Sequence, residues 1–232
     1  MILFCLDTSG PVAGVALMED GAVRYEAMAV NKFTHSQSIL PMTEEAFAKT
    51  GLEIQDADYF AVTVGPGSFT GVRIGVSTVK GLAHALNKPC VAVDALEAMA
   101  NGVSFFAGVI CPIQDARAGQ VYGAAFQGKT MARLLPDKPI KLEDFLDQAS
   151  AFSAPCLFLG DGMPVHREKI AEVMGDRACF APAHSAYLRP AAAAEWAWRH
   201  LEQAVEYKRL SPLYLRPPQA ERQKNLRELG HE

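Results

Sequence analysis

Several features common in membrane and secreted proteins are missing from this 232-residue sequence. It has no apolar run of about 18 residues, so no segment is expected to span a membrane. Its five cysteines contain no CxxC pair, and four lie in apolar, strand-like runs, which indicates reduced core residues. The first ten residues, MILFCLDTSG, lack a basic start and are interpreted as a strand and not as a signal peptide. These absences predict a cytoplasmic protein with no membrane partner.

Positive charge is also scarce. The net charge is −4 and the sequence pI is about 5.9, which argues against a free-standing nucleic-acid binder. The segment from Lys208 to Glu232 has six basic and three acidic residues, so it carries +3 and the rest of the chain carries −7. We interpret this tail as a solvated terminal segment, with contact to phosphate as the alternative.

Motifs of several enzyme classes are absent as well. The segment GPGSFTGVRIG, from Gly65 to Gly75, matches neither the Walker A loop nor GxGxxG, because Thr70 stands where a third glycine would be. No GxSxG elbow occurs, and no two of the six histidines are four residues apart. Ile39 follows His35 at that spacing and cannot bind a metal. A hydrolase is therefore unsupported, and no metal site is expected.

The hydrophobic pattern predicts an α/β chain with two similar halves. The first half is expected to have strands over 2–6, 12–18, 22–30, 59–64 and 90–93, and helices over 38–50, 72–86 and 96–100. Pro41 must lie in the first turn of its helix or bend it. The pattern restarts near Gly108, with strands over 109–111, 120–126 and 156–159, and helices over 142–148, 165–174 and 191–207. Each half places an aspartate after an early strand and a glycine turn after a later one, which suggests two related lobes.

Three polar residues, Asp7, Thr8 and Ser9, follow the first strand. The carboxyl end of a strand is where α/β sheets bind ligands, so these side chains are candidates to face a phosphate or a nucleotide. The alternative is an Asx turn that closes the strand.

The glycine-rich turn has two interpretations of equal weight. Gly65 and Gly67 could expose backbone N–H groups to an anion at the start of a helix. Alternatively, the turn begins a helix capped by Ser68 or Thr70.

Two further glycines, Gly71 and Gly75, lie four apart in the helix that follows. Glycine inside a helix costs about 1 kcal/mol relative to alanine. We therefore expect another backbone to approach closely there, either within the chain or from a partner subunit.

Three stretches together resemble the TsaB (YeaZ) family: His35-Ser36-Gln37 with Leu40-Pro41, GPGSFTGVRIG, and LSPLYLRPP near the end. The resemblance covers nearly the whole chain, and the glycine-rich stretch is its most specific part. Asp115-Ala116-Arg117 with Val121-Tyr122 matches a family motif less fully, because Gln120 stands where the family has glutamate.

The resemblance implies a two-lobed, actin-like ATPase fold, in which mixed, ribonuclease-H-like sheets are flanked by helices. The lobes are expected over residues 1–105 and 106–207, with the segment 208–232 completing the first lobe.

The resemblance also implies a non-catalytic subunit that activates the TsaD transferase together with the ATPase TsaE. That complex attaches threonylcarbamoyl to N6 of adenosine 37 in tRNA. TsaD carries an HxxxH metal pair, of which His35 retains only the first position. The chain is expected to form a heterodimer with TsaD, or a homodimer without it, and ATP or ADP is expected at most at the partner interface. The implied partner-facing residues are His35, Ser36, Ile39, Leu40, Thr43, Gly71, Arg73, Gly75 and Thr78.

Two other functions stay open. One is an independent ATPase of the actin-like class that uses Asp7 and the turns near Gly67 and Gly160. The other is a metallopeptidase, which the missing second histidine disfavours.

Overall fold

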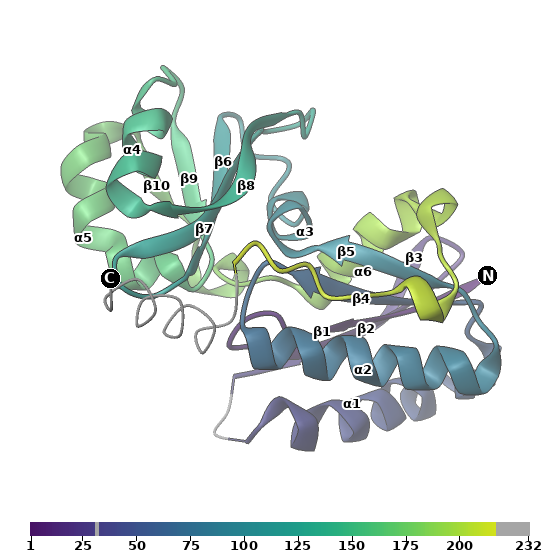
Figure 1. Cartoon of the computed structure of the whole chain (residues 1–232). Helices are drawn as coiled ribbons and strands as arrows, with labels where there is room; N and C mark the ends of the chain where they lie inside the picture. Colours follow the sequence, from purple (N-terminus) through teal and green to yellow (C-terminus); the bar gives the residue numbers. More distant parts are fainter. Residues whose placement is uncertain (31–32, 217–232) are drawn as a thin grey trace, which may run out of the picture.

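The computed structural model describes residues 1–30 and 33–216, which form two lobes, each built on a five-stranded sheet with helices against it (Figure 1). The first sheet has the order β3-β2-β1-β4-β5. Its strands are β1 (Ile2–Asp7), β2 (Ala13–Glu19), β3 (Ala22–Ala29), β4 (Tyr59–Gly65) and β5 (Cys90–Asp94). The first three strands are antiparallel, and β4 and β5 continue the sheet in parallel with β1.

The second sheet, β10-β9-β6-β7-β8, repeats this plan when it is read from its other edge. Its strands are β6 (Val109–Asp115), β7 (Gln120–Gln127), β8 (Arg133–Lys141), β9 (Cys156–Leu159) and β10 (Ala178–Phe180). Again three antiparallel strands are followed by two parallel ones. The expected fold class, mixed sheets with flanking helices in two related halves, is confirmed.

The helices also occur in corresponding positions in the two halves. They are α1 (His35–Thr50), α2 (Phe69–Leu86) and α3 (Ala95–Asn101) in the first half, and α4 (Leu142–Ser150), α5 (Gly162–Met174) and α6 (Pro190–Arg199) in the second. Short 3-10 turns lie at Ile54–Asp56, Gly175–Arg177, Ala183–Ser185, Leu201–Gln203 and Tyr207–Arg209. In the part of the chain that the structure describes, no helix is both long and apolar enough to cross a membrane.

The third helix of each half packs on the sheet of the other half. Helix α3 contacts β6 and β7, whereas α6 contacts β1 and β2 on the face of the first sheet opposite α1 and α2 (Figure 1). One hydrophobic cluster therefore joins the lobes and contains, for example, Leu3, Ile110 and Trp196. The expected second lobe, 106–207, thus includes a helix that lies on the first sheet, so its end at residue 207 is not a packing boundary.

The segment after α6 returns to the first lobe. Val205 pairs with Cys90 at the edge of β5, and Leu210 is buried in the hydrophobic cluster that α2 forms with the first sheet. The backbone N–H of Leu213 donates to the carbonyl oxygen of Val64 at 2.7 Å. Residues 205–213 therefore pack against the first lobe, and residues 217–232 of the segment that was expected to complete this lobe lie outside the described residues.

Two helices begin earlier than their apolar periodicity indicates. Helix α1 starts at His35 because the side chain of Gln37 accepts the backbone N–H of Thr34 at 3.1 Å. Pro41 therefore lies in the second turn of α1 and not in the first. Helix α2 starts at Phe69 because the Ser68 hydroxyl caps it, accepting the N–H of Gly71 at 3.2 Å.

Two other expectations in the second half differ from the structure. Strand β8 was not expected, because Pro136 and Pro139 break the sequence pattern, but an edge strand tolerates proline. The helix expected over 191–207 ends at Arg199, because His200 leaves the helical conformation and 3-10 turns follow.

The glycines of α2 face in two directions. Gly71 and Gly75 are buried against the end of β1: a Cβ on Gly71 would overlap the Thr8 carbonyl oxygen, and one on Gly75 would meet the Thr8 hydroxyl. Gly81 is exposed, and nothing lies within 4 Å of the position where its Cβ would be. The close approach expected at Gly71 and Gly75 is therefore internal, between α2 and the chain after β1.

This difference predicts opposite effects of alanine along one helix. Gly71→Ala is expected to lower the free energy of unfolding by about 2 kcal/mol or more, because the new methyl group displaces the Thr8 backbone. Gly81→Ala, the matched control, should raise it by about 0.5 to 1 kcal/mol through helix propensity alone. Urea denaturation measures both, and equal effects of the two substitutions would contradict this packing.

An ionic cluster ties α3 to β8 across the lobes. Arg133 forms ion pairs with Glu97 and Asp137 and lies 3.9 Å from Asp94. Asp94 also caps α3 by accepting the N–H of Glu97 at 2.8 Å. Burial, together with the neighbouring Asp137 carboxyl, raises the pKa of Asp94 to about 8. One arginine thus faces three carboxyl groups, of which Asp94 keeps its proton to an unusually high pH.

Stability should depend on pH through Asp94. The folded protein keeps this proton to a higher pH than the unfolded chain, so the free energy of unfolding should fall as the pH rises from about 4 to about 8. Asp94→Asn removes this titration and should stabilise the protein at pH 9 by about 1 to 2 kcal/mol. Thermal unfolding between pH 5 and pH 9 measures the effect, with the exposed Asp176→Asn as control. An unchanged slope in Asp94→Asn would contradict the assignment.

Candidate functional site

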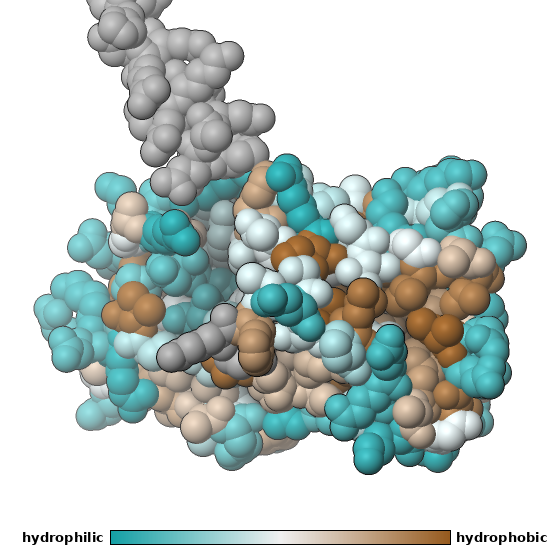
Figure 2. Space-filling model, turned by 90° about the horizontal axis from the view of Figure 1, so that it is seen from below, coloured by the Kyte–Doolittle hydropathy of each residue, from teal (hydrophilic) through white to brown (hydrophobic). Residues whose placement is uncertain are grey.

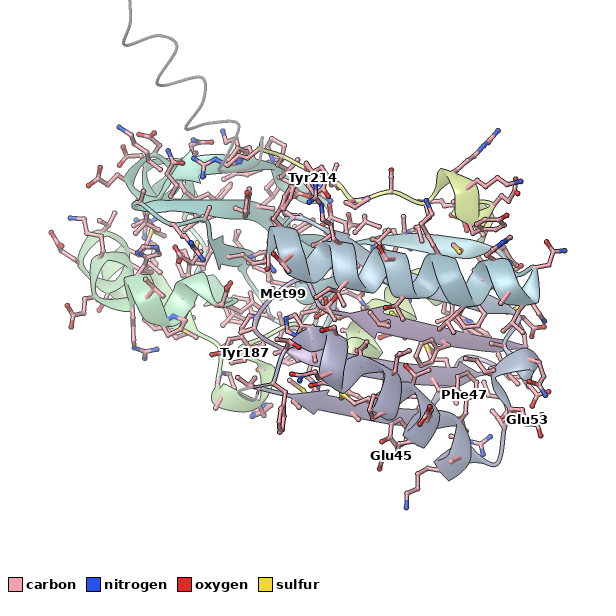
Figure 3. All side chains as sticks on the ribbon, turned by 60° about the horizontal axis from the view of Figure 1, so that its bottom comes forward. Glu45, Phe47, Glu53, Met99, Tyr187 and Tyr214 are labelled. Carbon is pink, nitrogen blue, oxygen red and sulfur yellow. The ribbon has the colours of Figure 1, made fainter. Side chains whose placement is uncertain are left out.

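A cleft of about 720 Å³ lies between the lobes. The first lobe contributes the turns after β1 and β4, the second contributes the turns after β6 and β9, and residues 213–216 form part of the rim. In Figure 3, Tyr214, Met99 and Tyr187 lie along the junction of the lobes, whereas Phe47 and Glu53 lie at the far side of the first lobe. The cleft is lined by Ser9, Gly10, Pro11, His35, Pro66, Gly67, Ser68, Phe69, Thr70, Gln114, Asp115, Ala116, Arg117, Tyr122, Asp161, Leu213, Tyr214, Leu215 and Arg216.

The glycine-rich turn packs on the turn after β1. The N–H of Ser68 donates to the carbonyl oxygen of Ser9 at 2.7 Å, and the Thr8 hydroxyl donates to the carbonyl oxygen of Gly71 at 2.8 Å. Gly67 has a φ of 157° and leaves no room for a Cβ beside Ser9. The N–H groups of Ser68 and Gly71 are thus used within the chain, which favours the capped helix start over an anion-binding loop.

Two other residues of this turn, Gly65 and Thr70, differ in their exposure. Gly65 is buried and has a φ of 125°, and the Leu213 carbonyl oxygen lies 2.6 Å from where its Cβ would be. The side chain of Thr70 is exposed and lines the cleft. Of the two expected capping residues, Ser68 therefore caps α2 and Thr70 does not.

Asp7 is buried, with 1% of its surface exposed. Its Oδ1 accepts hydrogen bonds from the Ser9 N–H at 2.9 Å, the Ser9 hydroxyl at 2.7 Å and the Thr63 hydroxyl. Burial raises the pKa of Asp7 against the opposing effect of these donors. The Asx turn that was one of the two sequence interpretations is therefore present, and Asp7 and Thr8 do not line the cleft, whereas Ser9 does.

The expected partner-facing residues divide into buried and exposed groups. Four of them, Ile39, Thr43, Gly71 and Gly75, are buried in the first lobe, and the Thr43 hydroxyl donates to the Ile39 carbonyl oxygen. These four do not present a surface to another protein, which corrects the sequence interpretation: helical periodicity identifies one face but not the direction it points.

The remaining five are at least partly exposed. Ser36 and Leu40 are exposed on α1, and Thr78 is half-buried on α2. A ring nitrogen of His35 lies 3.0 Å from the carbonyl oxygen of Gly10. Arg73 is already engaged inside the chain: its guanidinium stacks on Phe69 at 3.7 Å and donates to the Tyr214 hydroxyl at 2.7 Å.

Residues 213–216 form a strap across the mouth of the cleft. Besides its bond to Arg73, Tyr214 stacks on Phe69 with ring centroids 4.6 Å apart. Arg216 donates to the carbonyl oxygen of Ala116 in the second lobe at 3.3 Å. The sequence indicated this stretch only through the family resemblance, because no periodic pattern marks it.

The second lobe supplies two acidic groups, of which the sequence analysis named Asp115 as part of a family motif but did not name Asp161. Asp161 accepts the N–H of Asp115 at 3.3 Å, and Asp115 accepts the N–H of Arg117 at 3.0 Å. Burial and the charge of Asp115 raise the pKa of Asp161 to about 6. His166 Nε2 lies 3.8 Å from Asp115 Oδ1. The Gly160-Asp161-Gly162 turn of the sequence repeat was the signal that could have indicated this group.

Gln120 closes the hairpin through its backbone. Its N–H donates to the Arg117 carbonyl oxygen at 3.1 Å, and its own carbonyl oxygen accepts the N–H of Ala116 at 2.9 Å. The hairpin therefore forms without a glutamate at this position.

A metal centre requires several ligating side chains that lie close together. Within the described ranges, no group of three or more His, Cys, Asp or Glu side chains is arranged to hold a metal ion. Ile39, four residues after His35, is buried and offers no ligand. The turns of both lobes and the strap of residues 213–216 surround the cleft, and Arg216 links the strap to the second lobe.

Comparisons with known proteins agree over most of the chain. The family model for "TsaD: tRNA N6-adenosine threonylcarbamoyltransferase" matches residues 30–224. The tRNA threonylcarbamoyladenosine biosynthesis protein TsaB of Bacillus subtilis is 35% identical over 224 residues, covering 95% of this chain and 96% of the relative.

Solved structures show the same similarity. An uncharacterized protein from Pseudomonas aeruginosa "with similarity to peptidase YEAZ" superposes with a TM-score of 0.76 at 29% identity, covering 93% of this chain and 99% of the other. YeaZ from the same organism superposes with a TM-score of 0.73 at 28% identity, covering 92% and 99%. With this similarity in sequence and in structure along nearly the whole length, the chain belongs to the TsaB (YeaZ) family.

Proposed function

We propose that this chain is the non-catalytic TsaB-type subunit of a complex that forms N6-threonylcarbamoyladenosine at position 37 of tRNA, and that it acts in the cytoplasm by binding and activating a TsaD-like transferase. The observation that carries the proposal is the 35% identity to TsaB over 95% of this chain. A TsaE-like ATPase and tRNA are further partners of the assembled complex.

The loss of the second histidine supports a non-catalytic role. A helix-borne metal pair needs two ligands one turn apart on the same face. Here His35 is followed at that spacing by Ile39, which packs in the core of the first lobe. Transfer chemistry that depends on such a pair must therefore come from the partner subunit.

The outer face of α1 and α2 is the surface that we assign to the transferase. Figure 2 views the molecule from this side and shows brown, hydrophobic side chains gathered over the two helices with teal ones around them. Leu40 is 49% exposed on α1. On α2, one stripe that points away from the sheet consists of Ile74, Thr78, Gly81 and Ala85.

Gly81 is the most informative residue of that stripe. An exposed glycine in mid-helix weakens the helix, and no group of this chain approaches Gly81 closely enough to require it. A partner helix that packs directly on α2 would require it, because a side chain there would hold the two backbones apart. A second copy of this chain is the alternative occupant when the transferase is absent.

A larger side chain at position 81 should block binding of the TsaD-like transferase without unfolding this chain. Gly81→Leu is expected to weaken binding by at least about tenfold, equivalent to about 1.4 kcal/mol, and Leu40→Glu should have a similar effect. Calorimetric titration with the TsaD-like protein measures both. Val165→Glu is the surface control, because Val165 is 62% exposed on the second lobe. Undiminished binding in both variants would rule out this face.

Reconstitution tests the function itself. With a TsaD-like transferase, a TsaE-like ATPase, tRNA and threonylcarbamoyl-adenylate, adding this chain should raise modified-adenosine formation well above background, and the chain alone should hydrolyse no ATP. Mass spectrometry of digested tRNA and a phosphate-release assay give the two readouts. ATP hydrolysis by the isolated chain that is lost in Asp7→Ala would support the independent ATPase instead.

A further inference from the structure

A second, much smaller cavity adjoins the cleft and is lined by the end of β1 and the turn after it in the first lobe and by Gln114 of β6 in the second. Its volume is about 10 Å³, enough for a single water molecule. Asp7, Gln114 and Asp161 supply its polar lining, and Met99 and Tyr187 are among its apolar and aromatic walls. Figure 3 shows Met99 and Tyr187 at this junction of the lobes.

Two buried oxygens at this cavity lack a hydrogen-bond donor. Asp7 is 1% exposed and Gln114 is 3% exposed, and neither Asp7 Oδ2 nor Gln114 Oε1 has a partner. The other oxygen of Asp7 is fully used, because three donors from Ser9 and Thr63 converge on it. Gln114 reaches the first lobe, since its amide nitrogen lies 3.8 Å from where a Cβ on Gly10 would be.

Asp7 Oδ2 and Gln114 Oε1 belong to residues that line one cavity, and as two acceptors they cannot hydrogen-bond to each other. A single proton between them gives both oxygens a hydrogen-bond partner. We propose that Asp7 is protonated on Oδ2 and that this O–H donates to Gln114 Oε1, directly or through one water molecule in the cavity. The pair is then a latch that joins the two lobes at the base of the cleft. It is independent of the proposed function, because it concerns how the lobes are held and not what the chain binds.

The surroundings of Asp7 favour its neutral form. Burial raises its pKa, and in the described part of the chain no lysine or arginine forms an ion pair with it. The titratable groups that face it are His35 from α1, Cys5 from β1, and Asp161 from the turn before α5. The interaction with His35 lowers the pKa of Asp7 and so opposes the effect of burial. A charged Asp161 would disfavour a second negative charge in the same cavity.

Carbon-13 NMR of the whole protein labelled at aspartate carboxyl groups tests the proton directly. The Asp7 signal, assigned by its loss in Asp7→Asn, should keep the shift of a carboxylic acid from pH 4 to pH 8. Asp161→Asn is the matched control and should leave that signal in place. If Asp7 titrates at or below the usual range of an aspartate, the latch is overturned, because an ionised Asp7 would then accept the amide N–H of a turned Gln114.

Stability measurements test the donor and the acceptor separately. Asp7→Asn should retain the fold with its melting temperature changed by less than about 2 °C at pH 6, because the amide can still donate to Gln114 and accept from Ser9. Gln114→Leu should lower the melting temperature by about 3 to 6 °C, because the proton of Asp7 loses its acceptor. Wild-type stability should also fall as the pH rises above the usual range of aspartate, and Asp7→Asn should lose that component.

Two further results would overturn the latch. One is a Gln114→Leu protein that is as stable as the wild type. The other is a melting temperature that rises with added magnesium or potassium chloride in the wild type but not in Asp7→Asn, because a cation would then occupy the place assigned to the proton.

Discussion

The close packing of the turn after β1 on the start of α2 is the contact on which the rest of the structure depends. Gly67 and Gly71 have no side chain, so the backbones of Ser9 and Thr8 can approach them directly. Two hydrogen bonds, Ser68 to Ser9 and Thr8 to Gly71, hold the two segments together. This contact closes one wall of the cleft, and α2 continues from it to the surface that we assign to the partner.

The third helix of each half packs on the sheet of the other half, and this packing joins the two halves. Each half repeats the same order of strands and helices, but α3 and α6 each cover the sheet of the other half. A core shared in this way resists separation of the lobes, because separation would expose apolar surface on both sides. The strap, the Arg133 cluster and the Asp7–Gln114 junction add polar links across the same boundary.

Much of the fold followed from local patterns, whereas the candidate site did so only in part. Most strands and the repeat of the two halves could be predicted, because apolar runs and glycine turns are local signals. The roles of Gly71 and Gly75 were harder to predict, because spacing along a helix does not show which side of that helix packs on the sheet. Asp161 escaped prediction, and the strap at Tyr214 was indicated only by the family resemblance, because their contacts are with neighbours more than 40 residues away in sequence.

By itself, the sequence determined that the chain is an α/β protein of two related halves, that the glycine-rich turn is neither of the common nucleotide loops, and that His35 lacks a second ligand one turn away. These properties depend on residue type and on short spacings. The tertiary structure decided that the glycine-rich turn is packed and capped, that Gly71 and Gly75 face inward while Gly81 faces outward, and that Asp7 and Gln114, from different lobes, line the same cavity. The physical reason is that burial and hydrogen-bond partners are set by contacts between distant segments, and a single sequence does not specify those contacts locally.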